Sequence, residues 1–421
     1  MNVVITEAGS ANNVGSMALI ENAVNIIKKR YDEVEIYIMC ADPISVKETL
    51  ILEGFNLKNI VVTEDLFTVP NNKFRKYIWL LSSILWIYYA KLVLIFTTRI
   101  ENFVFGQRKM LLAQIRNADV VICIGAERIN DIYYKIEFFS LHALHIYEKM
   151  GKDLLHFSLT IGPVFHKWSI KFAKKVLNNS KAILVRDQKS FDLLIKWEIN
   201  KPKIFNSYDI ALFQRQSLRG ETIVYNQYKL VKEKPIIAIS VINWRFKYAN
   251  GPSKFEDYIY SVAKAADYLI EKYNYQILFT PTLVGEENAI DDILASNYVF
   301  NKMKYKKNAT IIESLLSPSD LTSVFSVCKF GIVTRMHAAI LSSGGAGTPI
   351  IAINYLYKLR EYMKNIDSEE FSIDIDNVNE AFLIKAIDNL NQNYEYIKVK
   401  LFKKIILLKN ILDSHIDNAL N

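Results

Sequence analysis

The sequence predicts an α/β protein with two doubly wound domains, each built on a mainly parallel sheet. Short apolar runs of strand length alternate with helical stretches along most of the chain. This pattern is typical of parallel sheets whose two faces are covered by helices. The alternation stops once near the middle and then restarts, and a chain of 421 residues is longer than one hydrophobic core usually fills.

The first half of the chain, residues 1–215, is predicted to form an N-terminal domain. It begins with the apolar run NVVI, a loop rich in glycine and asparagine, and the helical stretch SMALIENAVNIIKKRY. The strand-like runs that follow, separated by helical segments, are VEIYIMC, NIVVT, ADVVICIG, DLLHFSLTIGP and KAILVRD. A long apolar helical region at 77–112 lies within this domain.

The second half repeats the pattern. Residues 216–233 are polar and lack periodicity, which predicts a linker. Residues 234–377 alternate from PIIAISVI to PIIAIN and form the C-terminal domain, and the charged helices of 378–421 are able to pack back across the domains. We expect the carboxyl ends of the strands of both sheets to line one central cleft, because ligands of open parallel sheets bind there.

The composition of the chain indicates which classes of ligand the protein could bind and in which cellular compartment it is expected. The net charge of +8 favours acidic ligands, nucleic acid or an anionic membrane, or simply reflects soluble lysine-rich helices. The sequence has no RNA-binding signature, zinc-finger spacing or dense basic block, so we expect no nucleic acid partner. The three cysteines lack disulfide or metal spacing, and MNVVITEAG begins as a strand rather than a signal peptide, which favours a cytoplasmic protein.

One apolar run leaves two interpretations open. The segment YIWLLSSILWIYYAKLVLIF at 77–96 contains a single charge, Lys91, and is long enough to span a bilayer. The strands on either side of it are expected in one sheet, which argues against a crossing. It is either a buried or hairpin helix of the domain or an interfacial helix that contacts the inner leaflet of the membrane. The basic residues that flank it, and that suit the second interpretation, are Lys73, Arg75, Lys76 and Arg99.

Four loops at the carboxyl ends of predicted strands carry candidate site residues. They are Asn13 and Gly15 in GSANNVGSMA, Gly125 and Arg128 in IGAERIND, Gly162 and Pro163 in TIGPVFHKW, and Arg186 in VRDQKS. The first loop lacks the lysine of a P-loop and the spacing of a dinucleotide-binding motif, but its small residues suit close approach of a ligand. Each loop also has an ordinary interpretation as a turn or a surface ion pair. Asp187 is expected to cap the helix that follows it.

The segment TRMHAAILSSGGAGTP has an arginine and a histidine where a strand becomes a helix. Arg335 and His337 follow the apolar run FGIV and lie at the first turn of a helix whose dipole favours an anion. His142 and His145, three positions apart on a helix, have a spacing that metal ligands use, but no third ligand is near them in the sequence. We therefore predict no metal site, and we expect His156 to be a core residue.

Taken in order, these segments resemble the polysaccharide pyruvyl transferase family. The resemblance covers residues 13–365 and rests on NNVGSMALI, ADVVICIGAERIND, TIGP, VRDQKS, YDIAL and TRMHAAILSSGGAGTPIIAINYLYKLREYM. The last segment has the most distinctive pattern: Arg-x-His, small residues, Gly-x-Pro and Tyr-x-x-Lys. The first loop departs from the family by carrying Ser16 where an acidic residue is usual.

The resemblance implies two Rossmann-like domains in a GT-B-like arrangement and a transferase without a cofactor. Members of the family use phosphoenolpyruvate as co-substrate and place a pyruvyl ketal on a sugar of a cell-surface glycan. Arg186, His337 and Lys358 match positions important in the family and are the catalytic candidates, and Arg335 accompanies them. A glycan or lipid-linked oligosaccharide acceptor would suit a cytoplasmic enzyme that is peripheral on the inner face of the membrane.

The charges of these residues fit such a donor. The phosphate and carboxylate give phosphoenolpyruvate roughly three negative charges, and Arg186, Arg335 and Lys358 supply a comparable positive charge. Histidine side chains ordinarily exchange protons near neutral pH, so His337 is a candidate general acid or base.

Two alternatives remain open at this point. One is a nucleotide-sugar glycosyltransferase of the same architecture, and the other is a catalytically silent glycan-binding relative. A glycosyltransferase would often place a carboxylate on the nucleotide ribose, but residues 336–360 contain no Asp or Glu.

Overall fold

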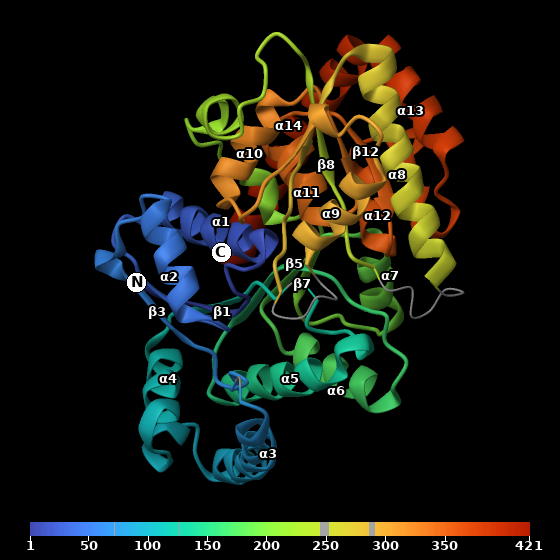
Figure 1. The fold of residues 1–421 in the computed structure, drawn as a ribbon. Helices are drawn as coiled ribbons and strands as arrows, with labels where there is room; N and C mark the ends of the chain where they lie inside the picture. The colour runs from blue at the N-terminus through green and yellow to red at the C-terminus, as the bar shows by residue number, and fades with distance from the viewer. Residues whose placement is uncertain (71, 126, 245–251, 286–290) are drawn as a thin grey trace. The chain divides into compact units, whose positions relative to one another are not determined.

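The computed structural model describes residues 1–70, 72–125, 127–244, 252–285 and 291–421. These residues divide into two compact units (Figure 1). The N-terminal unit consists of Met1–Ala11, Leu19–Ile210 and Ile411–Asn421, and the C-terminal unit consists of Asn12–Ala18 and Ala211–Asn410. Each unit contains one parallel sheet with helices packed on it, so the prediction of two doubly wound α/β domains is confirmed.

The sheet of the N-terminal unit has the strand order β3-β2-β1-β4-β5-β6-β7, and all of its pairings are parallel. Its strands are β1 Asn2–Ala8, β2 Glu35–Cys40, β3 Ile60–Glu64, β4 Val120–Cys123, β5 Leu154–Leu159, β6 Ala182–Val185 and β7 Lys203–Asn206. The strands β4, β5 and β6 are buried along their whole length, which explains their nearly continuous apolar sequences. The strand order reverses between β1 and β4, where ligands of such sheets usually bind.

Helices cover both faces of this sheet. They are α1 Val14–Arg30, α2 Pro43–Leu52, α3 Lys73–Phe96, α4 Gly106–Asn117, α5 Tyr134–Lys149, α6 Lys167–Asn178 and α7 Gln188–Lys196. Figure 1 shows α1 and α2 on one face and α4, α5 and α6 on the other. Leu112, Leu144 and Val176, one from each of the latter three helices, lie in the hydrophobic core beneath them.

The sheet of the C-terminal unit has the strand order β10-β9-β8-β11-β12-β13 and is also parallel throughout. Its strands are β8 Ile236–Ser240, β9 Gln276–Phe279, β10 Ala309–Ile311, β11 Phe330–Val333, β12 Ile350–Asn354 and β13 Ser372–Asp374. The helices are α8 Pro252–Tyr273, α9 Asp292–Lys302, α10 Pro318–Val327, α11 Met336–Ala339, α12 Tyr357–Asn365, α13 Glu380–Gln392 and α14 Tyr394–Leu420. A π-helix, η8 Ile340–Gly345, continues α11 without a break.

The chain passes from one unit to the other after Ile210, earlier than the sequence indicated. The polar residues 216–233, expected as a linker, belong to the C-terminal unit, where Gly220 N donates to Ser323 Oγ at 3.0 Å. Their polarity reflects a π-helical turn on the surface of that unit, η5 Thr222–Gln227.

Two segments belong to a different unit from the residues next to them in the sequence. The end of α14, Ile411–Asn421, lies in the N-terminal unit, where Arg30 Nη2 donates to Asp413 Oδ1 at 2.6 Å and Arg30 Nε donates to Asp417 Oδ1 at 2.7 Å. Conversely, Asn12–Ala18 belongs to the C-terminal unit although it follows β1. From the sequence this loop is expected in the N-terminal domain, because it directly follows the first strand of that domain.

Candidate active site

The carboxyl ends of β11 and β12 form the first part of the candidate site. The buried apolar strand β11 ends at Val333, and Arg335 then takes an extended conformation at the N-cap position of α11. Because β11 and β12 are parallel neighbours, the segments that follow them leave the sheet at the same edge. His337 therefore follows β11, and Lys358 follows β12 in the first turn of α12, at one edge of one sheet.

Arg335 is held by a buried carboxylate. Its Nε and Nη2 atoms donate to Oδ1 of Asp292 at 3.2 and 2.7 Å. Burial disfavours the charge of Arg335, but the carboxylate of Asp292 and the hydroxyl of Tyr355 outweigh burial and raise the pKa of the guanidinium. Arg335 is thus a fixed cation, and Asp292 is a site residue that the sequence analysis did not single out.

Asp292 also connects Arg335 to the first glycine-containing loop. Its second oxygen, Oδ2, accepts a hydrogen bond from the backbone N of Leu283 at 3.0 Å. Leu283 in turn forms an isolated antiparallel bridge with Asn13. The side chain of Asn13 accepts from Gly15 N at 3.0 Å, which fixes the turn that opens α1. This series of contacts explains why the loop belongs to the C-terminal unit.

Gly15 lies directly against His337. A methyl group in place of the hydrogen on Gly15 would come within 2.1 Å of Nδ1 and 2.3 Å of Cγ of the imidazole. Only glycine allows the backbone to approach the ring so closely. The structure therefore brings four of the predicted site residues together in one unit: Asn13, Gly15, Arg335 and His337.

The small residues after His337 have a packing role. Ser343 Oγ lies 2.7 Å from the hydroxyl of Tyr362 and donates to Ala339 O at 2.6 Å. A methyl group on Gly344 would lie 2.5 Å from Cδ2 of Leu212. The run of small side chains thus lets the π-helix η8 pack closely against neighbouring segments, and it holds the start of α11 in place.

The loop after β12 completes this edge of the C-terminal sheet. Tyr355 forms a side-chain hydrogen bond with Arg335, and its ring lies 5.0 Å from that of Trp244, which follows β8. Lys358 is 4% exposed, and its helix α12 packs against α11. Arg335 and His337 lie at the amino end of the continuous helix formed by α11 and η8, where the helix dipole favours an anion, and Lys358 follows the neighbouring strand at the same edge of the sheet.

Arg186 lies in the N-terminal unit, at the carboxyl end of β6. It is 2% exposed, its Nε donates to Thr160 Oγ1 at 2.7 Å, and its Nη1 donates to the carboxylate of Asp209. Burial opposes the charge of Arg186, but Asp209 and Glu127 outweigh burial and raise its pKa. The YDIAL segment thus supplies the counter-ion of the VRDQKS segment. As expected, Asp187 caps α7, accepting from Ser190 N at 2.8 Å.

One nitrogen of the Arg186 guanidinium does not donate a hydrogen bond to any described residue. This atom, Nη2, lies 3.7 Å from Glu127. A buried N–H group without an acceptor costs free energy, so the position of this group calls for an explanation such as a water, an ion or a catalytic role.

The second predicted loop surrounds a buried glutamate. Arg128 N donates to Gly125 O at 3.2 Å, and its Nη2 donates to the backbone O of Glu7 at 3.1 Å. Burial raises the pKa of Glu7 to about 7, although Arg128 and the hydroxyl of Ser140 act in the opposite direction. Glu7 also has a left-handed backbone, with φ of 61°. The sequence offered one signal for it, an acidic residue at the end of the apolar strand NVVITEA.

Gly162 and Pro163 join the third loop to the second. Gly162 N donates to Ile129 O at 2.8 Å, and Asp131 N donates to Pro163 O at 2.9 Å. Gly162 has φ of +100°, a conformation that favours glycine. The side chain of Asp131 accepts from His166 N at 2.7 Å, so this carboxylate serves the loop structure.

His142 and His145 take structural positions between helices. His142 Nδ1 lies 2.7 Å from Phe138 O, its Nε2 lies 3.1 Å from Nζ of Lys91, and burial lowers its pKa to about 4. His145 Nδ1 lies 2.9 Å from Glu148 Oε2. These contacts hold α3, α5 and adjoining segments together.

In the described part of the chain, Glu7, Cys123 and His156 form a group whose potential metal-ligand atoms lie within 4.8 Å of one another. His156 Nε2 lies 3.0 Å from Ser180 Oγ, and burial lowers its pKa to about 4. Burial also raises the pKa of the Cys123 thiol. All three residues of this group are buried, as are all three cysteines of the chain.

The fold defines the class of protein. It is similar to a putative UDP-N-acetylglucosamine 2-epimerase from Listeria monocytogenes, with a TM-score of 0.58, 12% identity, and coverage of 95% of this chain and 90% of that one. It is also similar to Alr3699/HepE of Anabaena in complex with UDP and glucose, with a TM-score of 0.56, 12% identity, and coverage of 100% and 98%. At these identities the likeness shows the fold alone, which is that of the two-domain GT-B class.

The family follows from the sequence comparison. The family model described as polysaccharide pyruvyl transferase matches residues 13–357, and the chain belongs to this family. The amylovoran biosynthesis protein AmsJ of Erwinia amylovora is 24% identical over 302 residues, which cover 69% of this chain and 70% of that protein. The resemblance seen in the sequence is therefore confirmed, and the protein is a transferase with a role in polysaccharide modification. The match contains every predicted site residue except Lys358, which follows its last residue.

Proposed function

We propose that the protein transfers the enolpyruvyl group of phosphoenolpyruvate to a sugar of a cell-surface polysaccharide, or of its lipid-linked precursor, as a pyruvate ketal. The observation that carries this proposal is the group formed by Arg335, His337 and the Gly15 loop at one edge of the C-terminal sheet. Its cations suit an anionic donor, and its imidazole suits a reaction that moves protons.

The C-terminal unit would bind the donor. Phosphoenolpyruvate carries roughly three negative charges. Arg335 has a fixed guanidinium plane, suited to a carboxylate or phosphate, and Lys358 adds a point charge for the leaving phosphate. The amino end of α11 offers backbone N–H groups to the same anion. Arg186, at the carboxyl end of β6 in the N-terminal unit, is proposed as a further catalytic residue of the reaction.

The reaction needs three proton transfers, and His337 is suited to assist one of them. A proton added to the methylene carbon of phosphoenolpyruvate makes C2 electrophilic, and a sugar hydroxyl attacks C2 as it loses its own proton. The C2–O bond to phosphate then breaks and phosphate leaves. A neighbouring hydroxyl attacks C2 and closes the ketal, and its proton passes to the released phosphate or to water. We propose His337 as the general acid or base, because an imidazole exchanges protons near neutral pH.

The N-terminal unit would bind the acceptor. Arg128, Gly125 and the Gly162–Pro163 turn follow β4 and β5, and parallel sheets bind ligands at such ends. We further propose that the protein acts in the cytoplasm, as a peripheral protein on the inner face of the membrane where a lipid-linked acceptor would be available.

Mass spectrometry of candidate acceptors tests this proposal. The purified protein is incubated with phosphoenolpyruvate and lipid-linked or free oligosaccharides, and each acceptor is examined for an added pyruvyl group while free phosphate is measured. We expect the two products to appear together and to fall by a factor on the order of 100 to 10,000 in His337→Ala. Release of a nucleoside diphosphate from a nucleotide sugar would instead identify a glycosyltransferase, and the absence of both activities would identify a glycan-binding relative.

A further inference from the structure

Helix α3 leaves a broad apolar face exposed. Large apolar side chains on this face are 56% to 74% exposed: Phe74, Leu81, Leu85, Tyr88, Leu92 and Ile95. They recur at intervals of three, four or seven residues, so they share one side of the helix. We call this surface the α3 face.

The opposite side of α3 packs against its own unit. Ile87 and Ala90 are buried, and the ring of Trp79 lies 4.7 Å from that of Phe139 on α5. Helix α5 in turn packs on β5, so α3 forms an outer layer at the edge of the N-terminal unit, as Figure 1 shows. A helix that is apolar on all sides normally has both sides covered, yet only the inner side of α3 is covered in the described part of the chain.

The α3 face is too large and too apolar for an ordinary solvent-exposed surface. The segment Phe74–Phe96 is long enough to cross a membrane, and an 18-residue stretch of it has a mean hydropathy of 1.8 with 17% of its residues buried. Contiguous apolar surface of this size usually marks a binding surface. A crossing does not fit the fold, because β3 before α3 and β4 after it belong to the same sheet.

The surroundings of the α3 face carry positive charge. Residues 72–110 contain seven lysines and arginines and one acidic residue, Glu101. Glu101 is buried and pairs with Arg116 Nε at 3.2 Å, so it offers no negative charge to the surface. The exposed residues Arg75, Lys76 and Arg99 flank the two ends of the helix.

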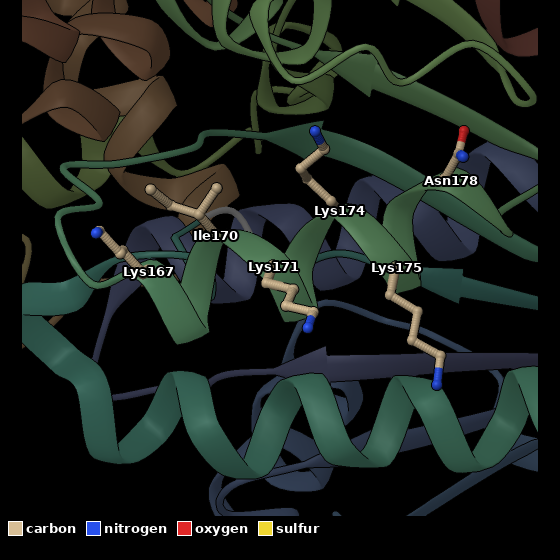
Figure 2. Close-up of a pocket in the computed structure, with 6 residues that line it drawn as sticks. All are labelled: Lys167, Ile170, Lys171, Lys174, Lys175 and Asn178. Atoms are coloured by element: carbon tan, nitrogen blue, oxygen red, sulfur yellow. The ribbon is translucent and has the colours of Figure 1, made fainter.

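A lysine-lined groove on α6 extends this basic surface. The groove has a volume of about 480 Å³ and is lined by Lys167, Ile170, Lys171, Lys174, Lys175 and Asn178 (Figure 2). Figure 2 shows Lys171 and Lys175 reaching from α6 toward the neighbouring helix, while Lys174 points the other way. Lys91 of α3 lies 5.3 Å from the ring centre of Phe172 on α6, so the groove adjoins the apolar helix.

We propose that the α3 face binds the surface of an anionic lipid membrane. The helix would lie in the plane of the headgroups with its apolar side chains among the acyl chains, and Lys171 and Lys175 of α6 would contact lipid phosphates. Apolar insertion beside basic charge is the combination that stable interfacial binding requires. The charge also argues against a second copy of the chain as occupant, because pairing would bring two basic surfaces together.

Co-sedimentation with vesicles tests the proposal. The full-length protein is mixed at low salt with vesicles of phosphatidylcholine, with or without phosphatidylglycerol. The apolar variant is Leu81→Gln/Leu85→Gln/Leu92→Gln, and its matched control is Ile44→Gln/Leu52→Gln, which changes exposed apolar residues of α2. The charge variant is Lys171→Gln/Lys175→Gln, which changes the two lysines that point the same way, with Lys47→Gln/Lys58→Gln as its control.

We expect the wild-type protein and both controls to sediment with phosphatidylglycerol vesicles. The charge variant should bind on the order of 20-fold more weakly, and the apolar variant should lose most of its binding. Failure of the wild-type protein to sediment would overturn the proposal, as would unchanged binding by the apolar variant. A wild-type dimer that the apolar variant converts to a monomer, with no lipid binding by either, would identify a second copy as the occupant and would also overturn it.

This inference extends the proposed location but not the proposed reaction. The vesicles contain no sugar acceptor and no phosphoenolpyruvate, so lipid binding can fail while pyruvyl transfer succeeds, and the reverse. Turnover with a water-soluble acceptor should be the same for the wild-type protein and the apolar variant, because α3 carries none of the proposed site residues.

Discussion

At the residue scale, the contact between Gly15 and His337 links the first and last motifs of the family pattern. The two residues are far apart in the sequence, and the backbone of one lies against the ring of the other. An imidazole that exchanges protons with a substrate must keep its orientation, because small displacements at a reacting centre are costly. Gly15 therefore helps to position the His337 ring, in addition to any contact that Gly15 makes with a ligand.

Gly15→Ala should lower kcat on the order of 100-fold while the fold is retained, because the added methyl group would displace the imidazole. Gly331→Ala is the matched control: it lies in the same unit, and its added methyl group would find its nearest atom at 3.4 Å, an ordinary contact. Steady-state turnover and thermal unfolding of both variants check this prediction. Normal turnover by Gly15→Ala would show that the contact does not position His337.

The carboxyl group of Glu7 should make stability depend on pH. Burial raises its pKa from 4.5 to about 7, so between these values the unfolded chain loses a proton that the folded protein keeps. Stability therefore falls as pH rises through this window, by about 3 kcal/mol for this group. Glu7→Gln removes the effect, so its stability relative to the wild type should rise by that amount between pH 4.5 and 7.

Denaturant unfolding at several pH values measures this difference. Glu35→Gln, at the exposed start of β2, is the control and should leave the pH profile of the wild type unchanged. Parallel profiles for Glu7→Gln and the wild type would mean that Glu7 is ionised in the folded protein.

Arg186 has a structural role, as the partner of Asp209, and a proposed chemical role. A single substitution would remove both roles at once, so its effect could not be assigned to either one. Arg186→Ala leaves Asp209 buried without its counter-ion, a change that costs about 3–5 kcal/mol. The variant Arg186→Gln/Asp209→Asn removes both charges and should recover most of that stability. We expect it to remain folded but to lose turnover with phosphoenolpyruvate. Normal turnover by this double variant would assign Arg186 to the fold alone.

At the element scale, the site of the C-terminal unit depends on how several segment ends are joined. Asp292 at the start of α9 accepts from Leu283 after β9 and from Arg335 after β11. The π-helix η8 fixes the start of α11 from the other side, through Ser343 and Tyr362. The position of Arg335 therefore depends on α9, on the loop after β9 and on η8, in addition to the strand β11 that precedes it.

Asp292→Asn should loosen this arrangement. The amide keeps some hydrogen bonds but leaves the Arg335 charge without its partner, which should cost about 3 kcal/mol and raise the KM for phosphoenolpyruvate. Asp291→Asn is the control, because Asp291 caps α9 and asparagine caps a helix equally well. Unfolding and the KM are measured for both. A lower stability with an unchanged KM would separate Asp292 from donor binding.

At the scale of the whole molecule, the sequence predicts the two sheets well. Parallel strands buried on both faces are apolar along their length, and this signal depends only on neighbouring residues, as in β4 VVIC and β11 FGIV. The unit to which a loop belongs depends instead on contacts between remote residues. The bridge between Asn13 and Leu283 leaves no trace in local composition, so the sequence places this loop in the N-terminal domain, whereas its contacts place it in the C-terminal unit.

For the candidate site too, the sequence predicts residues with a local signal but misses those that depend on contacts between remote segments. Arg335 and His337 stand out because a strand ends beside them, and the family resemblance adds Lys358. Asp292 and Glu7 do not stand out, because one is an ordinary acidic residue in a helical run and the other ends an apolar strand. Their significance comes from burial and from partners that only the folded chain supplies.

Titration calorimetry with phosphoenolpyruvate tests the central claim most directly. The claim is that Arg335, His337 and Lys358 of the C-terminal unit form the site for this donor. Wild-type protein should bind phosphoenolpyruvate and not UDP, and Lys358→Met should weaken that binding on the order of 30-fold. Binding of UDP in place of phosphoenolpyruvate, or equal binding of phosphoenolpyruvate by wild type and Lys358→Met, would contradict it.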